Sequence, residues 1–182
     1  MKITAIILAG GKSSRMGEDK GLMLLNGKAM IQHIIDAVKT LVDDVIIVSN
    51  QKGYNKFGYA VYHDSIKNAG PLAGLYEGLT HTKTKKNIVL SCDVPFVNNK
   101  VIKTLIENCE NTDVVICENE NKTHQLIGVY DKSCANFFKE ELENNQRKVK
   151  LALSKLNTKT IDFNHLDNQL FKNINSKNDI TA

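Results

Sequence analysis

The residues best suited to chemistry stand near the start of the sequence, in a polar segment that follows an apolar run. Two adjacent glycines, Gly10 and Gly11, are followed by the cationic side chains of Arg15 and Lys20. Glycine lets backbone N–H groups approach an anion closely, and Lys and Arg neutralise its charge. The segment therefore predicts a phosphate-binding loop.

Arginine is rare in this chain, and its positions are informative for that reason. Only Arg15 and Arg147 occur among the 24 basic residues. Because lysine supplies a plain positive charge elsewhere, an arginine beside the glycines indicates a planar fork that binds phosphate oxygens in pairs.

Two aspartates follow apolar runs at positions where ligands bind in α/β proteins. Asp93 comes after the run at residues 87–91, and Asp64 follows the run at residues 59–62. A carboxylate at the tip of a buried strand suits Mg²⁺, which takes one or two carboxylates together with phosphate oxygens. The alternative for Asp93 is a cap on the following helix. The chemistry favours Asp93 as a metal ligand.

The segment Gly70-Pro71-Leu72-Ala73-Gly74 opens a predicted helix. Proline is well tolerated at a helix start, where its missing N–H costs no hydrogen bond. The flanking glycines permit close approach of a flat ligand. On residue chemistry alone, the segment is either a plain loop-to-helix transition or part of a binding site.

The glycine-rich segment fits neither of two common phosphate loops. Its glycine spacing differs from the Walker A pattern and from the GxGxxG dinucleotide fingerprint. Residues 8–20, which read LAGGKSSRMGEDK, instead resemble the signature of the molybdenum cofactor guanylyltransferase family. GPLAG at residues 70–74 and Asn-x-Asn at residues 173–175 match further segments of that family's pattern.

This resemblance implies an enzyme that transfers GMP from GTP to molybdopterin with Mg²⁺ and releases pyrophosphate. It implies catalytic roles for Arg15, Lys20 and Asp93, with Asp93 as the metal ligand. The nucleotide-binding residues that it implies are Leu8, Ala9, Gly10, Gly11, Lys20, Asp64, Gly70, Gly74 and Asp93. On the acceptor side it implies Arg147, Asn173 and Asn175, and it suggests molybdoenzyme-maturation proteins as partners.

Three alternatives remain open on the sequence. One is a cytidylyltransferase acting on the same pterin, although such relatives usually carry LAAG where this chain has LAGG. Another is a sugar-phosphate nucleotidyltransferase, and these enzymes are generally longer. A third is a non-catalytic nucleotide-binding module, which would not need Asp93.

The elements that must position these residues follow from the apolar pattern. Short apolar runs rich in β-branched residues predict buried strands, and helical periodicity appears between them. The alternation predicts an α/β fold: one Rossmann-like domain over residues 1–182, a three-layer sandwich with a mostly parallel central sheet and helices on both faces. The predicted strands are residues 3–8, 45–48, 59–62, 87–91, 113–117, 125–130 and 158–163, the sixth antiparallel; the predicted helices are residues 30–41, 72–79, 98–108, 133–143 and 149–156.

Composition sets further bounds on function. The chain has 182 residues, 42% of them hydrophobic, and a net charge of +4. Lys83, Lys85 and Lys86 form a tight basic cluster, which predicts a solvated loop and no nucleic-acid interface. No apolar run is long enough to span a membrane, and the first residues do not resemble a signal peptide, so we expect a cytoplasmic protein.

Overall fold

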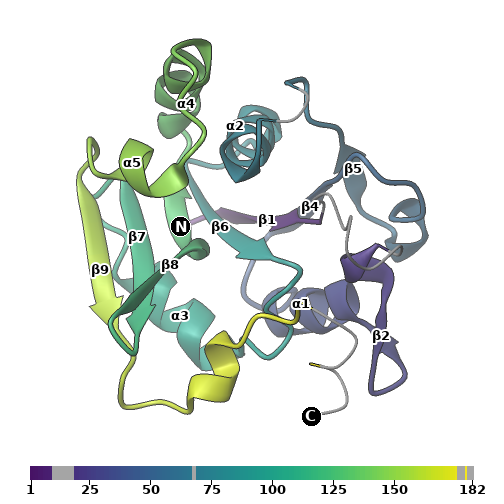
Figure 1. The fold of residues 1–182 in the computed structure, drawn as a ribbon. Helices are drawn as coiled ribbons and strands as arrows, with labels where there is room; N and C mark the ends of the chain where they lie inside the picture. Colours follow the sequence, from purple (N-terminus) through teal and green to yellow (C-terminus); the bar gives the residue numbers. More distant parts are fainter. Residues whose placement is uncertain (10–18, 67–68, 176–178, 180–182) are drawn as a thin grey trace.

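The fold is that of a central sheet with helices on both faces, as seen in the computed structural model of the chain (Figure 1). The structure describes residues 1–9, 19–66, 69–175 and 179. Within these residues, seven strands form one sheet in the order β5-β4-β1-β6-β8-β7-β9. Neighbouring strands run parallel except where β8 pairs antiparallel with β6 and with β7. The predicted α/β class and the antiparallel sixth strand are therefore confirmed.

The strand bounds agree closely with the apolar runs. The sheet consists of β1 (Ile3–Leu8), β4 (Asp44–Val48), β5 (Ala60–Tyr62), β6 (Lys86–Ser91), β7 (Val114–Asn119), β8 (Lys122–Asp131) and β9 (Thr158–Asp162).

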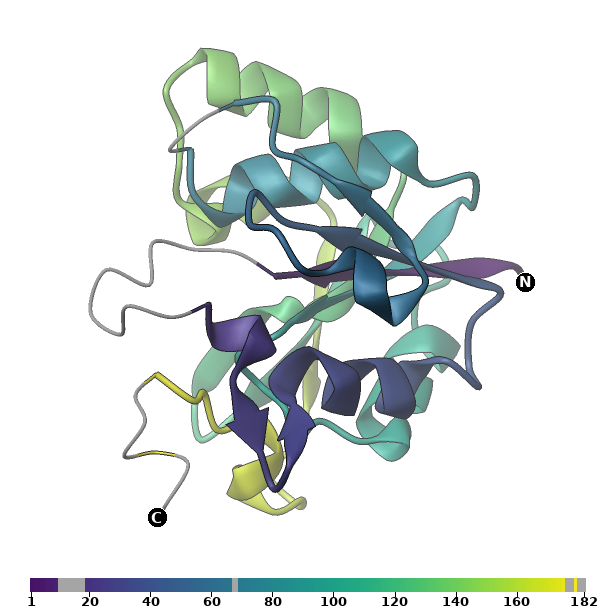
Figure 2. The same ribbon diagram turned by 90° about the vertical axis from the view of Figure 1, so that its right-hand side faces the viewer.

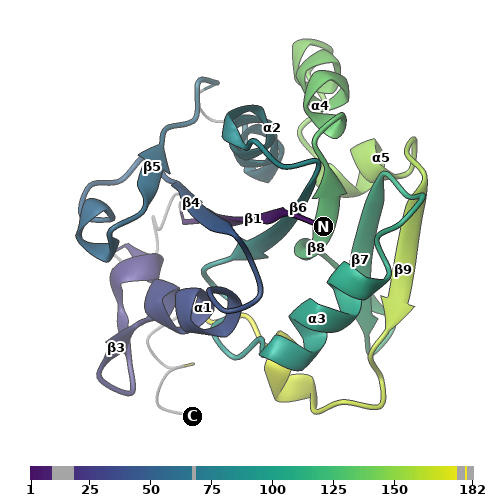
Figure 3. The ribbon, with the colours of Figure 1, turned by 180° about the vertical axis from the view of Figure 1, so that it is seen from behind.

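Two groups of helices cover the sheet, one on each face (Figures 1 and 3). One group is α1 (Met30–Val38) and α3 (Asn99–Glu107), and the other is α2 (Pro71–His81), α4 (Cys134–Glu143) and α5 (Val149–Leu153). Strand β1 contributes to both cores because alternate side chains point to opposite faces. Ala5 and Ile7 pack with α1 and α3, whereas Ile6 and Leu8 pack with α2 and α4.

Helix α2 lies unusually close to β1. A Cβ atom built on Gly78 would lie 2.4 Å from Ile6 Cγ2, and one built on Gly74 would lie 3.4 Å from Leu8 Cδ2. Glycine at these positions lets the helix approach the strand. The start of α2 is thereby held over the carboxyl end of β1.

Short elements account for the main differences from the sequence prediction. A two-stranded hairpin of β2 (Leu24–Leu25) and β3 (Lys28–Ala29) precedes α1. The predicted turn at residues 119–122 is tighter, because Glu120 and Asn121 alone form it, with φ of 53° and 59°. Positive φ at both central residues is typical of the type I′ hairpin turn.

One expectation about charge was wrong. Lys86 is not in a solvated loop: it is 6% exposed, and its Nζ lies 3.1 Å from Asp131 Oδ2. Lys86 is the first residue of β6 and Asp131 the last of β8, so the two strands bring them opposite each other. A buried lysine requires such a partner.

The chain after β9 returns along the α1 side of the sheet (Figure 2). Short 3₁₀ helices lie at Lys20–Leu22 (η1), Asn55–Phe57 (η2) and Asn168–Phe171 (η3). Ile174 is buried with Met23, Leu25 and Met30 around the hairpin. This packing brings the last described segment beside the residues that follow the glycine-rich loop. None of the helices in the described ranges could cross a membrane.

Candidate active site

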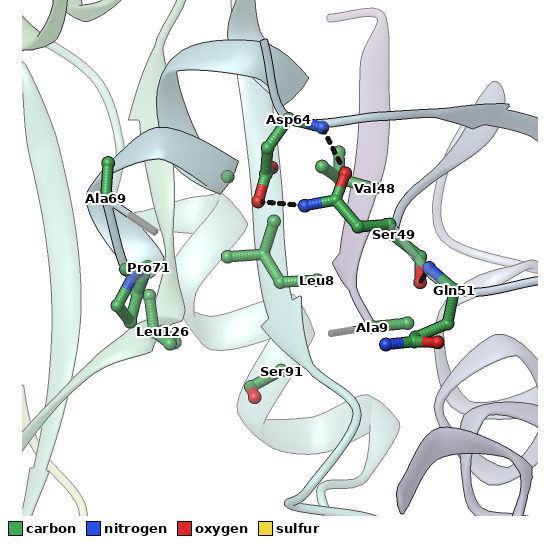
Figure 4. Close-up of a pocket in the computed structure, with 13 residues that line it drawn as sticks. Leu8, Ala9, Val48, Ser49, Gln51, Asp64, Ala69, Pro71, Ser91 and Leu126 are labelled. Carbon is green, nitrogen blue, oxygen red and sulfur yellow. Dashed lines mark hydrogen bonds between the residues drawn. The ribbon is translucent and has the colours of Figure 1, made fainter. Parts of the chain in front are cut away.

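The candidate site lies where the carboxyl ends of β1, β4 and β6 meet. Leu8 is in register with Val48 on one side and with Ser91 on the other. In open α/β sheets this edge is where ligands bind. A cavity of about 570 Å³ opens there (Figure 4). Its lining residues are Leu8, Ala9, Val48, Ser49, Asn50, Gln51, Asp64, Ala69, Gly70, Pro71, Gly74, Ser91 and Leu126.

The start of α2 forms one wall of this cavity. Gly70 has φ of 71° and ψ of −164°, a backbone conformation that residues other than glycine rarely adopt. Pro71 is the first helical residue, as its position in the sequence predicts. Gly74 faces Leu8 and Asp64, and a Cβ atom there would lie 3.8 Å from Asp64 Oδ1. The wall therefore presents little side chain and leaves room for a flat ligand.

Asp64 places a carboxylate in the cavity, and Asn50 holds it there. Asn50 Nδ2 donates to Asp64 Oδ2 at 3.1 Å, and Asp64 N donates to Asn50 Oδ1 at 2.9 Å. The other oxygen, Asp64 Oδ1, is buried without a hydrogen-bond partner among the described residues. Burial and the neighbouring Glu77 carboxylate raise the pKa of Asp64. A buried, unsatisfied carboxylate oxygen is suited to accept an N–H from a ligand.

A second group of residues surrounds Asp93, next to the cavity. Ser91, which lines the cavity, donates its hydroxyl to Asp93 Oδ1 at 2.6 Å. Asn173 Nδ2 lies 3.5 Å from Asp93 Oδ2, and Ile174 N donates to the Asp93 backbone carbonyl at 2.8 Å. The Asn-x-Asn segment therefore lies against the predicted metal ligand.

Lys20 belongs to the same group. Its Nζ donates to Asn175 Oδ1 at 3.0 Å, a contact between positions 155 residues apart. Asp19 caps the η1 turn that carries Lys20: Asp19 Oδ1 accepts from Gly21 N at 3.0 Å and from the Tyr54 hydroxyl at 2.6 Å. The buried ring of Tyr54 thus anchors the turn.

Asp93 is not the cap of the following helix. Helix α3 is capped by Asn98, whose side chain accepts from Val101 N at 3.1 Å. In the part of the chain that the structure describes, Asp93 has no cationic partner, and its side-chain oxygens accept from a hydroxyl and an amide. No three His, Cys, Asp or Glu side chains cluster there as metal ligands. One such carboxylate suits Mg²⁺ that is shared with a nucleotide.

Arg147 is placed differently from the two asparagines. Its Nη1 donates to the Leu142 carbonyl at 2.8 Å, at the end of α4. Its backbone carbonyl lies 3.9 Å from a Cβ position built on Gly70. The α4–α5 connection therefore lies beside the start of α2, which forms the cavity wall. The structure shows no contact that joins Arg147 to Asn173 or Asn175 within the described ranges. Gly10, Gly11 and Arg15 lie outside those ranges.

The cavity also contains residues that the sequence did not single out. Asn50 follows the predicted strand at residues 45–48, and that position at a carboxyl end was an available signal. Leu126 reaches the cavity from the antiparallel strand β8, for which no sequence signal exists. Glu77, which does not line the cavity, lies behind Asp64 on α2 and is 8% exposed.

Several known proteins are similar to this chain in sequence. The sequence model of the "MobA-like NTP transferase domain" family matches residues 5–158. A probable molybdenum cofactor guanylyltransferase of Flavobacterium johnsoniae is 34% identical over 179 residues, which cover 98% of this chain and 94% of the relative. The molybdenum cofactor guanylyltransferase of Yersinia pestis is 33% identical, with 97% and 92% covered.

Solved structures show the same fold. A protein of Aquifex aeolicus superposes with a TM-score of 0.82 at 28% identity, with 96% of this chain and 94% of that chain covered. The molybdopterin-guanine dinucleotide biosynthesis protein A of Archaeoglobus fulgidus also superposes with a TM-score of 0.82, at 22% identity, with 98% and 95% covered.

Proposed function

Because this chain belongs to the MobA-like NTP transferase family, we propose that it is a molybdenum cofactor guanylyltransferase, which transfers GMP from GTP to molybdopterin and releases pyrophosphate. One observation carries the assignment of substrates to the site. The cavity has a buried carboxylate acceptor, Asp64, at one side, and it reaches Asp93 through Ser91 at the other. This order matches a nucleotide with its base at Asp64 and its phosphates toward Asp93.

The base end favours guanine over cytosine. The Watson–Crick edge of guanine carries N–H donors on N1 and N2, which suit the unpaired Asp64 Oδ1. Cytosine presents one donor on this edge, its 4-amino group, beside the acceptors N3 and O2, so it cannot give the carboxylate the two adjacent donors that guanine offers. A site with buried polar groups rejects a ligand that leaves them unpaired. Gly70 and Gly74 leave space for the purine ring beside Leu8 and Ala9.

The phosphate end uses the cationic residues. We propose that Gly10 and Gly11 donate backbone N–H groups to the phosphates, while Arg15 and Lys20 neutralise the β- and γ-phosphates. Lys20 Nζ is paired with a neutral amide oxygen of Asn175, so its charge remains available for a phosphate. The charge that develops on the departing pyrophosphate is then stabilised by groups already in place.

Asp93 is the residue that would hold Mg²⁺. The metal, when bound, polarises the α-phosphate and offsets the repulsion between substrate oxygens and the carboxylate. Ser91 and Asn173 orient the Asp93 side chain through their hydrogen bonds.

The transfer itself is an in-line displacement at the α-phosphorus. A phosphate oxygen of molybdopterin forms the new P–O bond, and the bond from the α-phosphorus to the oxygen that bridges it to the β-phosphorus breaks. The electron pair leaves with pyrophosphate. The protein contributes alignment and charge stabilisation, because this chemistry requires no covalent intermediate. We propose that residues 1–182 do this as one nucleotidyltransferase domain.

The acceptor side remains assigned by resemblance. Asn173 and Asn175 support this role because they contact Asp93 and Lys20, respectively. They belong to the segment on the α1 side of the sheet, whereas α2 forms the cavity wall on the other side. Arg147 borders Gly70 instead. If it contacts the acceptor, its guanidinium must exchange its bond to the Leu142 carbonyl for one to the ligand. Maturation proteins as partners stay a prediction.

The test is transfer with each nucleotide in turn. Purified protein is incubated with molybdopterin, Mg²⁺ and GTP, CTP, ATP or UTP, and both pyrophosphate and the dinucleotide product are measured. We expect product with GTP at a kcat/KM at least about a hundredfold above that with CTP. Equal use of CTP would overturn the assignment of guanine, and a preference for CTP would make the enzyme a cytidylyltransferase. Nucleotide binding without pyrophosphate release would indicate a non-catalytic module.

A further inference from the structure

Behind Asp64 lies a buried acid that the transfer reaction does not use. Glu77, on α2, is 8% exposed. Its Oε2 accepts from Ser65 N at 3.1 Å, and its Oε1 accepts from His81 Nε2 at 2.8 Å. Burial opposes ionisation, but the hydrogen bonds from Ser65 and His81 outweigh it and hold the pKa of Glu77 below its usual value. Glu77 is therefore a buried carboxylate.

Glu77 and its partner His81 contact residues on both sides of Asp64, the residue proposed to bind the edge of the base. Ser65 directly follows Asp64, and Glu77 fixes its backbone N–H. Tyr62 precedes Asp64 by two positions, and the His81 ring stacks on it at 3.9 Å with an interplanar angle of 12°. Between them, His63 Nδ1 donates to the Ser49 carbonyl at 2.6 Å. The segment that carries Asp64 is thus held on both sides by one helix.

Stability alone does not explain why a charge is buried here. Ser65 and His81 are both exposed, so water could satisfy their N–H groups. Burying a carboxylate is costly unless its hydrogen bonds are made, and an apolar side chain would fill the same space without that cost. What the glutamate adds is a fixed geometry next to Asp64 and a negative charge that raises the pKa of Asp64. A more basic carboxylate is a stronger hydrogen-bond acceptor.

From these contacts we propose that Glu77, supported by His81, is a positioning residue that sets guanine specificity: it holds residues 62–65 so that the Asp64 carboxylate meets the N1–H and 2-amino group of the base. This inference rests on the proposed use of GTP. Glu77 does not touch the ligand. Its effect reaches the base through the backbone on either side of Asp64 and through its charge beside the Asp64 carboxylate.

The test compares three variants. E77Q keeps the shape but cannot accept from Ser65 N and from His81 together. H81F keeps the ring on Tyr62 and removes the donor to Glu77. E141Q is the matched control, because Glu141 is also a helical glutamate, is 6% exposed and accepts from Lys155 Nζ at 2.7 Å. Dissociation constants are measured for GTP, for ITP, which lacks the 2-amino group, and for CTP at fixed Mg²⁺. Transfer kinetics and melting temperatures are measured in parallel.

We expect E77Q to weaken GTP binding roughly tenfold, with a smaller loss of about threefold in H81F. The ratio of GTP to ITP affinity falls in both, because ITP makes fewer contacts to lose. KM for GTP rises much more than kcat falls. E141Q lowers the melting temperature and leaves the GTP to ITP ratio unchanged.

Different results would contradict different statements. If wild type does not prefer GTP over CTP, the proposed function and this inference both fall; if it prefers GTP over CTP but not over ITP, only this inference falls. If wild type prefers GTP over both and the variants retain the wild-type ratio, only the role of Glu77 falls. H81F alters a partly exposed side chain, so it decides the question even if E77Q does not fold.

Discussion

Asp93 is held by neutral groups, and this distinguishes it from the acids that form ion pairs in this protein. Its partners are the Ser91 hydroxyl and the Asn173 amide. We expect Asp93→Asn to fold normally, because the amide can still accept from Ser91, and to lose almost all transferase activity. GTP binding in the variant should lose most of its dependence on Mg²⁺. GTP titrations at several Mg²⁺ concentrations measure this directly.

Asn98 provides the control for that experiment, since it carries the capping role once considered for Asp93. Asn98→Ala should cost about 1 kcal/mol of folding free energy through the loss of its bond to Val101 N. Activity per folded molecule should be unchanged. An Asp93→Asn protein that keeps the wild-type Mg²⁺ dependence would place the metal elsewhere.

Asp64 gives a prediction about pH. Burial, followed by the Glu77 charge, raises its pKa above that of an ordinary aspartate, while bonding to Asn50 and the nearby His63 act in the opposite direction. The carboxylate needed for guanine is therefore lost at a higher pH than an ordinary aspartate would lose it. We expect GTP affinity to be full well above this raised pKa and to fall as the pH decreases through it.

The comparison is with Asp64→Asn, which cannot titrate at this position. Both proteins bind the same GTP, so the titration of the phosphates cancels in the ratio of their dissociation constants between pH 4 and 8. The variant should bind weakly and lack the additional acid-induced loss. Parallel pH profiles for the two proteins would remove Asp64 from the base contact.

At the scale of one element, two glycines about one turn apart in helix α2 have different roles: Gly74 affects binding and Gly78 affects stability. Gly78 faces Ile6, where an added Cβ atom would lie at 2.4 Å, so Gly78→Ala should destabilise the fold by about 1–3 kcal/mol. Gly74 faces Leu8 and Asp64 at 3.4 and 3.8 Å, so Gly74→Ala should raise KM for GTP with little loss of stability. Urea unfolding and steady-state kinetics on both variants measure the two effects. Equal loss of stability in both would contradict the division.

The sequence predicted those elements whose signal is local. The apolar cores of strands β1, β4 and β6 are buried, so their carboxyl ends could be placed, and with them Asp93 after β6. Asp64 was placed from the shorter run that forms β5. The β2–β3 hairpin has only two residues per strand, too few for a periodic pattern. Strand β8 starts at polar Lys122, which alternation did not reveal.

The site was predictable to the extent that its residues end strands or match a family pattern. The wall at Gly70 and Gly74 and the acids followed from those signals. The bond from Asn50 to Asp64 and the approach of Asn173 to Asp93 did not, because they depend on how distant segments pack. Lys86 was misplaced for the same reason: its partner, Asp131, is remote in sequence.

At the scale of the whole molecule, the buried pair of Lys86 and Asp131 lies at the opposite end of the sheet from the site, beside the first residue of β1. Lys86→Met would leave Asp131 buried without its cation, so we expect a loss of about 3 kcal/mol. GTP affinity should be unchanged. Burial opposes ionisation of Asp131, but bonds from Ser133 and Lys86 outweigh it and lower its pKa.

The sign of the pH effect on this pair follows from that lowered pKa. The pair stabilises the fold at neutral pH, and the stabilisation is lost as the pH falls through the folded-state pKa of Asp131. The difference in unfolding free energy between wild type and Lys86→Met should therefore shrink in acid. Urea unfolding at pH 7 and near pH 3 tests this. A constant difference would show that the lysine stabilises by packing alone.

The hydrogen bond between Lys20 and Asn175 also has a consequence for the order in which the site is completed during protein synthesis. A ribosome adds roughly 5 to 20 residues per second, so the 155 positions between them correspond to roughly 8 to 31 seconds of synthesis. In that interval the chain acquires β4, β6 and, with Leu126, the last of the residues that line the base cavity. It lacks the asparagines assigned to the acceptor. On this assignment all the residues of the base cavity are synthesised before those of the acceptor side, and transfer requires a chain that extends through Asn175.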